Sequence, residues 1–240
     1  MIAQPPLDDV AVPPAVVAVA RGRALHPLWH NELGGLTYGV GDDLVVKWSP
    51  PALDLAPERE RLAWASAYAV VPEVVDHGAD DDGSWLITRR LPGQNAVSPR
   101  WTAQPATAVA ALGQGLRALH DRLPVDDCPF SWSVADRLTE VADPAARTAL
   151  AAAPDVDRLV VCHGDACAPN TLLDDDGRWS GHVDLGSLGV ADRWADLAVA
   201  TWSTVWNYGP GWEGALLDAY GVAPDAERTA YYRALWDAGP

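Results

Sequence analysis

The sequence changes its pattern at Leu91-Pro92-Gly93, a tripeptide that interrupts regular secondary structure. Before this break, short apolar segments rich in β-branched residues alternate with glycine turns and predict strands with one helix. After it, alanine and leucine recur at helical spacing over long stretches, and only one hairpin is expected. The 240-residue chain is therefore expected to be an α+β protein, with a small β-rich lobe over 1–91 and a larger, mainly helical lobe over 92–240.

Each lobe can be divided further into predicted elements. In the first lobe we expect a meander of strands over 28–48, a helix over 57–68 and two strands over 74–77 and 84–88. In the second lobe we expect helices over 106–122 and 134–153, a buried strand over 158–162, a hairpin of 171–173 with 179–183, and helical structure over 192–236.

The formal net charge of −16 makes the surface of this protein strongly acidic. Such a surface repels nucleic-acid phosphates and anionic lipid headgroups, so binding to nucleic acid or to a membrane surface is disfavoured. A cationic small-molecule partner is favoured instead, although acidity of this size also serves solubility alone. No apolar run approaches the roughly 18 residues that a membrane-spanning helix needs.

The cysteines and the N-terminal residues bear on the cellular compartment. Cys128, Cys162 and Cys167 have no metal-ligand spacing, and an odd number of cysteines is a poor basis for a disulfide framework. Residues 1–20 include two aspartates and several prolines, and they lack the basic segment that begins a secretory signal. We therefore expect a cytoplasmic protein, either a monomer or a homodimer.

Lys47 is the only lysine of the chain. It lies in the apolar segment 44–48, where an unpaired ammonium group would be costly. A lysine at a strand edge can extend its ammonium group to solvent, but arginine would serve that purpose equally well. We therefore expect Lys47 to hold the α- and β-phosphates of a nucleotide. Glu58 of the following helix is its expected ionic partner, with Glu60 on a solvated face.

The segment His163-Gly164-Asp165-Ala166-Cys167-Ala168-Pro169-Asn170 directly follows the predicted strand 158–162. Asp165 and Asn170 stand five residues apart, as do the catalytic aspartate and the metal-binding asparagine of the protein-kinase catalytic loop. Such a pair is also common in turns and helix caps, so the spacing alone has a structural explanation as well. Asp165 is the candidate catalytic base and Asn170 a candidate ligand of Mg²⁺.

A second polar segment, His182-Val183-Asp184-Leu185-Gly186, follows the predicted hairpin. Asp184 takes the position of the second metal-binding carboxylate of a kinase. The backbone amides of Gly34, Gly35 and Leu36 are expected to cover the phosphates, although this segment lacks the full G-x-G-x-x-G pattern. Since phosphoryl transfer needs a lysine and metal ions to neutralise charge on the transferred group, these features in this order predict a bilobal protein-kinase-like fold.

Other interpretations explain fewer of these residues. His163 could act as a general base near neutral pH, but Asp165 already takes that position, and we expect a structural role for His163. Asp184 with His163 and His182 could form a metallohydrolase site, but that site leaves Lys47 and the glycine segment unexplained. A catalytically inactive kinase-like binding module would not need the complete set of lysine, two aspartates and asparagine.

The segments VCHGDACAPNTLL, GHVDLGSLGVADRWADLAVATW and YYRALWD resemble the aminoglycoside phosphotransferases, and the similarity extends over almost the whole chain. The resemblance implies ATP as the phosphate donor and Mg²⁺ as the metal. It also implies that Asp196 supports the catalytic loop from behind. The implied site residues are the base Asp165, the magnesium ligands Asn170 and Asp184, and the nucleotide-anchoring pair Lys47 and Glu58.

The acceptor is narrowed by three further segments, LWHNELGGLTY, DDCPFSWSV and TWSTVWNYGPGWE, which look most like the streptomycin 3″-phosphotransferases. The 3′-kinases of kanamycin and neomycin share the active-site motifs, but they end in an acidic, Phe-rich segment where this chain has Leu235-Trp236-Asp237-Ala238-Gly239-Pro240. The resemblance implies phosphorylation of the 3″-hydroxyl of streptomycin and resistance to it. A 3′-phosphotransferase or a related kinase of choline, homoserine or fructosamine is the alternative.

Acidic side chains would attract the guanidinium groups of a streptomycin-like acceptor. Each candidate could instead be an ordinary solvated carboxylate or a helix cap. The candidate acceptor contacts are Asp192, Glu213, Asp218 and Asp237.

Overall fold

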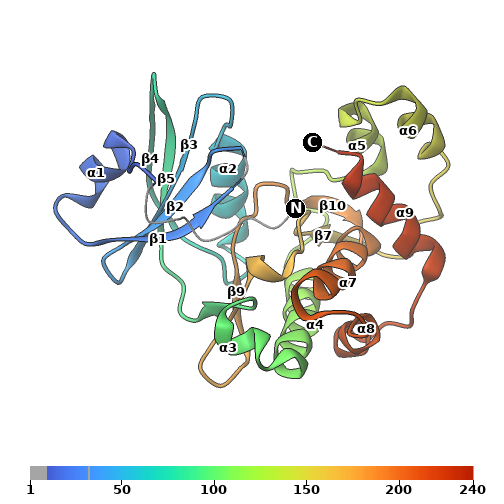
Figure 1. The fold of residues 1–240 in the computed structure, drawn as a ribbon. Coiled ribbons are helices and arrows are strands. Elements are labelled where there is room, and N and C mark those ends of the chain that lie inside the picture. The colour runs from blue at the N-terminus through green and yellow to red at the C-terminus, as the bar shows by residue number, and fades with distance from the viewer. Residues whose placement is uncertain (1–9, 32, 240) are drawn as a thin grey trace. The chain divides into compact units, whose positions relative to one another are not determined.

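The computed structural model describes residues 10–31 and 33–239, and these form two compact units (Figure 1). The first contains the described residues up to Ser66 together with Pro72–Leu91, and the second contains Ala67–Val71 together with the chain from Pro92 onward. Ala67–Val71 is tied to the second unit by a hydrogen bond of 3.2 Å from the amide of His182 to the carbonyl oxygen of Val70. The expected α+β composition is confirmed.

The first unit is built on a five-stranded antiparallel sheet with the strand order β1-β2-β3-β5-β4. The third strand lies at the centre, so both of its edges are paired. The strands are β1 Leu25–His30, β2 Leu36–Val40, β3 Leu44–Ser49, β4 Val74–Asp80 and β5 Gly83–Arg89.

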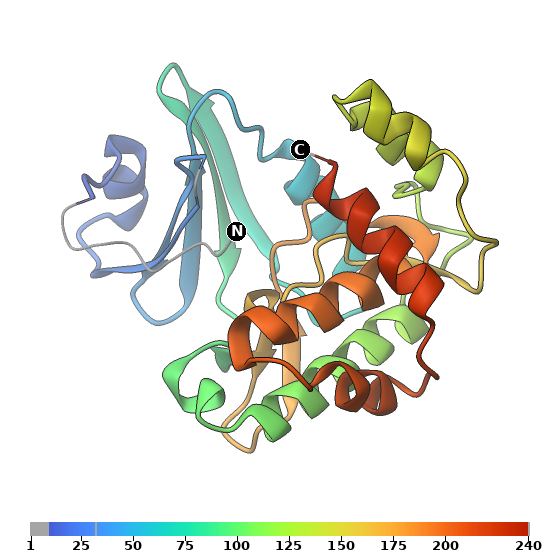
Figure 2. The same ribbon diagram turned by 45° about the vertical axis from the view of Figure 1, so that its right-hand side comes forward.

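Two helices, α1 Pro14–Ala20 and α2 Ala56–Ala65, lie on opposite faces of this sheet (Figures 1 and 2). Val16 of α1 is fully buried and shares a core with Val46 of β3. The sequence pattern did not predict α1, because a helix of seven residues depends on tertiary packing and shows little periodicity of its own. The helix expected over 57–68 is α2, which ends at Ala65.

In the second unit, α4 Pro105–Arg122 packs against α8 Glu213–Tyr220, and α7 Trp194–Tyr208 packs against α9 Ala226–Asp237 (Figure 2). The axes of α4 and α8 approach closely only because residue 113 is glycine. A Cβ atom there would lie 2.5 Å from the carbonyl oxygen of Leu216 and 2.7 Å from Cβ of Ala219.

The single helix expected over 134–153 is wrong, since this segment forms α5 Val134–Glu140 and α6 Pro144–Ala149. Proline lacks the N–H that would continue the first helix. The Asp143 side chain begins the second helix by accepting a hydrogen bond of 2.9 Å from the amide of Ala145. The second unit also contains α3 Pro99–Thr102 and a short 3-10 helix, η1 Ala168–Asn170.

Two small antiparallel sheets complete the second unit. In one, β7 Leu159–Cys162 pairs with β10 Gly189–Asp192. In the other, the expected hairpin of β8 Thr171–Leu173 and β9 Trp179–His182 is joined by β6 Gln94–Asn95. The polar segments 163–170 and 182–186, which the sequence analysis identified, lie at the ends of β7 and β9. Within the described residues, every helix is too short or too polar to cross a membrane.

Candidate active site

Lys47 and Glu58 form an ion pair in the first unit. Nζ of Lys47, on the central strand β3, lies 2.6 Å from Oε2 of Glu58, on α2. Because side chains alternate along a strand, the neighbouring Val46 points into the core while Lys47 faces the other side of the sheet. The Glu58 side chain is only 10% exposed, whereas that of Glu60 is 57% exposed and lies beside Arg59. The helix therefore directs Glu58, and not Glu60, to the lysine.

The amides of the glycine segment already have partners within their own loop. The amide of Gly35 donates to Oδ1 of Asn31 at 2.6 Å, and the amide of Gly34 donates to the carbonyl oxygen of Asn31 at 3.1 Å. Leu36 is the first residue of β2 and is paired with strands on both sides. The amides of Gly34 and Gly35 could bind phosphate only after giving up their hydrogen bonds to Asn31. Glu32, which the sequence places in this loop, lies outside the described residues.

Asp165 and Asn170 lie together in the second unit, in the segment that follows β7. Nδ2 of Asn170 donates to Oδ2 of Asp165 at 3.0 Å and to its carbonyl oxygen at 2.9 Å. Gly164 has a φ of +84°, and a Cβ atom there would collide with the backbone of Ser187. Only glycine fits this turn. The turn and the asparagine together fix the direction of the Asp165 carboxyl group.

The surroundings of Asp165 favour proton uptake. Burial raises the pKa of its carboxyl group above the ordinary value, and the negative charge of Asp184 adds to this effect. Hydrogen bonds from the Cys167 thiol and the Asn170 amide offset only part of the rise. Oδ1 of Asp165 is buried and accepts no hydrogen bond from the residues that the structure describes. Within the described residues, Asn170 therefore holds Oδ2 of Asp165, while Oδ1 accepts no hydrogen bond.

Asp184 follows β9 and is exposed, with a left-handed backbone at φ +64°. The backbone beside it is tied to the catalytic segment, since the amide of Val183 donates to the carbonyl oxygen of Asn170 at 2.9 Å. His163 provides a second tie, because its Nε2 lies 3.0 Å from the carbonyl oxygen of Val183. Asp165, Asn170 and Asp184 are therefore brought together, and His163 has a structural contact that agrees with its expected role.

Two residues of α7 support the catalytic segment from behind. Oδ2 of Asp196 accepts a hydrogen bond of 2.6 Å from the amide of His163, and Oδ1 accepts one of 2.9 Å from the amide of Gly164. Oγ of Ser203 accepts a hydrogen bond of 2.8 Å from the amide of Ala168. Ser203 cannot be selected from the sequence, because a serine within an apolar helix shows no pattern that identifies its partner.

The acidic candidates for acceptor binding do not share one environment. Asp192 is 3% exposed, and its carboxylate accepts hydrogen bonds from the amides of Asp157 and Trp194 at 2.7 and 3.0 Å. The prediction that Asp192 contacts the acceptor is therefore wrong, because its two oxygens hold the backbone amides that precede β7 and begin α7. Glu213 accepts a hydrogen bond of 3.0 Å from the amide of Gly211.

The other two candidates, Asp218 and Asp237, are exposed in the last turns of α8 and α9.

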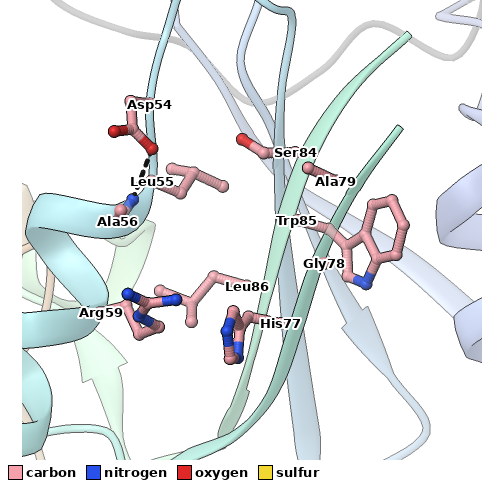
Figure 3. A pocket seen from close by; sticks show the side chains of 10 residues that line it. All are labelled: Asp54, Leu55, Ala56, Arg59, His77, Gly78, Ala79, Ser84, Trp85 and Leu86. Atoms are coloured by element: carbon pink, nitrogen blue, oxygen red, sulfur yellow. Dashed lines mark hydrogen bonds between the residues drawn. The ribbon is translucent and has the colours of Figure 1, made fainter. Parts of the chain in front are cut away.

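A cavity of about 260 Å³ lies within the first unit, between the start of α2 and the hairpin of β4 and β5 (Figure 3). Neither Lys47 nor Glu58 is among its lining residues, so it is distinct from the ion pair. The residues that line it are Asp54, Leu55, Ala56, Arg59, His77, Gly78, Ala79, Ser84, Trp85 and Leu86.

Two curated relatives are named as phosphotransferases or kinases of aminoglycosides or streptomycin. The chain is 37% identical over 213 residues to an aminoglycoside 3′-phosphotransferase of Streptomyces fradiae, which covers 77% of this chain and 79% of that protein. It is 35% identical over 244 residues to a streptomycin 3″-kinase of Streptomyces griseus, which covers 84% of this chain and 87% of that protein.

A solved structure of the aminoglycoside phosphotransferase APH(3″)-Id of Streptomyces rimosus has the same fold. It matches with a TM-score of 0.75 and 25% identity over 93% of this chain and 96% of that chain. The same protein in complex with ADP and streptomycin matches over the same shares, with a TM-score of 0.67 and 25% identity. The predicted protein-kinase-like fold is confirmed by these similarities.

A family model described as the phosphotransferase enzyme family matches residues 32–232. The match includes every residue that the sequence assigned to phosphate transfer and to metal binding. The predicted resemblance to the aminoglycoside phosphotransferases is confirmed by this match and by the named relatives. The chain therefore belongs to the phosphotransferase enzyme family and is an enzyme of that class.

Proposed function

We propose that this protein transfers the γ-phosphoryl group of ATP to a hydroxyl group of an aminoglycoside in the cytoplasm and so confers resistance to it. The observation that carries the proposal is the cluster of Asp165, Asn170 and Asp184 after β7 and β9, in a chain of the phosphotransferase family. The acceptor that we favour is the 3″-hydroxyl of streptomycin.

Asp165 is the proposed catalytic base. Its raised pKa supports the uptake of a proton from the acceptor hydroxyl, as does its buried Oδ1, which accepts no hydrogen bond from the described part of the chain. The hydroxyl oxygen would then form a bond to the γ-phosphorus, while the bond to the oxygen that bridges the β- and γ-phosphates breaks and ADP leaves with the electron pair. Asn170 would keep the carboxyl group in line through the hydrogen bond to Oδ2.

The second unit offers a donor set that fits Mg²⁺. Carboxylate and amide oxygens are the protein ligands that this cation prefers, and Asp184 with Oδ1 of Asn170 supplies them. The close approach of the Asp165 and Asp184 charges also favours a cation between or beside them. Bound magnesium would supply charge neutralisation for the phosphate oxygens.

The first unit is the proposed nucleotide-binding unit, and residues from Pro92 onward are the proposed catalytic and substrate-binding unit. The ion pair with Glu58 holds the Lys47 ammonium group in one position, which supports a role in gripping the α- and β-phosphates. That this pair and the Asp165 cluster act on one nucleotide is part of the proposal.

The acceptor is proposed from charge and from sequence similarity. A protein with a net charge of −16 attracts the guanidinium groups of streptomycin, and Glu213, Asp218 and Asp237 remain candidate contacts. The 3′-hydroxyl of a kanamycin-like acceptor is the second candidate, because the relative from S. fradiae is a 3′-phosphotransferase of similar identity.

The decisive assay incubates the purified protein with Mg-ATP and either streptomycin or kanamycin. We expect one added phosphate on streptomycin by mass spectrometry, and phosphorus–proton NMR correlation at the 3″ position. Phosphorylation of kanamycin alone would instead assign the 3′ activity. If neither antibiotic is modified while choline, homoserine or fructosamine is, the aminoglycoside assignment is wrong.

Single substitutions distinguish acidic residues that contact the acceptor from those that stabilise the fold. We expect Glu213→Gln, Asp218→Asn or Asp237→Asn to raise KM for streptomycin and to leave KM for ATP unchanged, if the residue touches the antibiotic. Asp192→Asn should instead lower the melting temperature, because its carboxylate holds two backbone amides.

A further inference from the structure

The Asp196 carboxylate behind the catalytic segment is itself held by a histidine from another helix. Nε2 of His120, on α4, lies 2.9 Å from Oδ2 of Asp196, and Nδ1 of His120 lies 2.8 Å from the hydroxyl oxygen of Tyr220, on α8. The side chains of His120 and Asp196 have no solvent exposure, and Tyr220 is 1% exposed. Three helices thus contribute one side chain each to a buried chain of hydrogen bonds.

This chain leads directly to the backbone of the proposed base. Asp196 accepts the amides of His163 and Gly164, which immediately precede Asp165. The direction of the Asp196 carboxylate therefore determines where the loop backbone lies. His120 controls that direction because its contact with Oδ2 fixes one edge of the carboxylate.

The protonation states of Asp196 and Tyr220 indicate which ring nitrogen of His120 donates a hydrogen bond and which one accepts. Burial opposes the ionisation of Asp196, but the hydrogen bond from His120 and the neighbouring donors together outweigh it and lower the pKa of Asp196. An ionised carboxylate only accepts hydrogen bonds, so the contact with Asp196 requires the tautomer with hydrogen on Nε2 of His120. Burial raises the pKa of Tyr220 to about 12, so its hydroxyl keeps a proton that it can donate to Nδ1.

We propose that His120 is a positioning residue for phosphoryl transfer and that Tyr220 selects the imidazole tautomer that this role requires. A hydroxyl that donates to Nδ1 favours the tautomer with hydrogen on Nε2, which is the donor to Asp196. In the other tautomer, Nε2 would present a lone pair to the carboxylate, and the loop amides of His163 and Gly164 would lose their fixed acceptor. The kinetic part of this inference rests on the proposed function.

A metal ion is the alternative occupant of this region, because ligand atoms of His120, Cys162 and Asp196 lie within 4.8 Å of one another. Asp196 already accepts three N–H groups. The Cys162 thiol donates to the carbonyl oxygen of Asp192 at 3.4 Å, and burial raises its pKa well above the ordinary value. These contacts account for all three residues as a hydrogen-bond network.

A matched pair of substitutions tests the contact with Asp196. In His120→Gln the amide nitrogen takes the place of Nε2 and can still donate to Asp196, whereas His120→Asn reaches only the position of Nδ1. We expect the asparagine variant to lower kcat about 10- to 100-fold, as partners that orient a functional group do, and the glutamine variant to stay within about threefold. KM for ATP should be unchanged in both.

A double-mutant cycle tests the selection of the tautomer. Tyr220→Phe should lower kcat in the wild-type background, because the imidazole is no longer held in one tautomer. In the His120→Gln background the same change should have little effect, because an amide nitrogen always carries hydrogen. Equal effects in the two backgrounds would overturn the selection by Tyr220. The comparison of Tyr220→Phe in these two backgrounds tests the inference even if His120→Asn does not fold.

Nitrogen NMR of the ¹⁵N-histidine-labelled protein reads the tautomer without any turnover, so it separates this inference from the proposed function. The His120 signals are identified by their loss in His120→Gln. We expect hydrogen on Nε2 in the wild type and a shift toward the other tautomer in Tyr220→Phe. Hydrogen on Nδ1 in the wild type, a stoichiometric metal in the purified protein, or kcat losses that follow the melting temperature in every variant would overturn the inference.

Discussion

A carboxyl group that is buried beside a second carboxylate is costly to ionise, and Asp165 is in this position. We expect Asp165→Ala and the isosteric Asp165→Asn to lower kcat by about 10²- to 10⁴-fold, the range that general-base catalysis contributes. Nucleotide affinity should change little, since the proposed phosphate contacts lie elsewhere. ADP release and calorimetry with a non-hydrolysable nucleotide measure the two quantities.

The control for this prediction is Asp81→Asn, which removes the same charge from an exposed turn between β4 and β5. Turnover there should match the wild type. An Asp165 variant with comparable turnover would remove this residue from its proposed role.

The ion pair in the first unit leads to a second prediction at the residue scale. Glu58→Gln removes the carboxylate that lies 2.6 Å from the Lys47 ammonium group, so we expect KM for ATP to rise and kcat to fall. Glu60→Gln, two positions along the same helix and 57% exposed, is the matched control and should have no effect. Steady-state kinetics at varied ATP concentration checks both, and equal effects of the two changes would contradict the assignment.

Residues differ in how far the sequence could predict them. Asp165, Asn170 and Asp184 can be selected as candidates from the sequence, because each stands in a short polar segment that follows a predicted strand and carries a side chain that the chemistry needs. Asp192 was misassigned, because a carboxylate that caps buried backbone amides looks in the sequence like one that faces solvent. Recognising it requires the pairing of β7 with β10, which places residues far apart in the chain side by side.

At the scale of elements, the close contact of α4 and α8 can be tested with two glycines. Gly113→Ala forces a Cβ atom against the carbonyl oxygen of Leu216, and overpacking of this kind costs about 1–3 kcal/mol. Gly214, on α8, has no heavy atom within 4 Å of an added Cβ, so Gly214→Ala should be neutral or stabilising by up to about 1 kcal/mol. Chemical denaturation measures both changes, and a stable Gly113→Ala variant would show that the helices can separate.

Elements were predictable from the sequence where the local pattern decides the structure. The β8–β9 hairpin and α4 follow from turn residues and helical spacing. The division of 134–153 into two helices follows from Asp143-Pro144, a helix-start signal that the apolar pattern of the region obscures. α1 could not be predicted, because seven residues become helical by packing against the sheet.

For the whole molecule, the change of pattern at Leu91-Pro92 coincides with the division between the two units. The exception is Ala67–Val71, which precedes the break in sequence but is bonded to β9. A short segment that belongs to one unit but lies within the sequence of the other has no local sequence pattern that reveals it. Likewise, the network of His120, Asp196 and Tyr220 joins three side chains that stand 24 or more positions apart in the sequence, and no spacing rule connects them.

The net charge is a property of the whole molecule, and it predicts opposite salt effects for the two substrates. A chain with a net charge of −16 attracts a cationic antibiotic and repels anionic ATP, and both interactions weaken as the Debye length falls from about 30 Å at 0.01 M salt to about 10 Å at 0.1 M. We expect kcat/KM for streptomycin to fall several-fold over this range, and kcat/KM for ATP to stay constant or rise. Because each substrate serves as the control for the other, a parallel fall of both would show that salt acts on the fold or on the chemical step, and that the surface charge does not guide the acceptor.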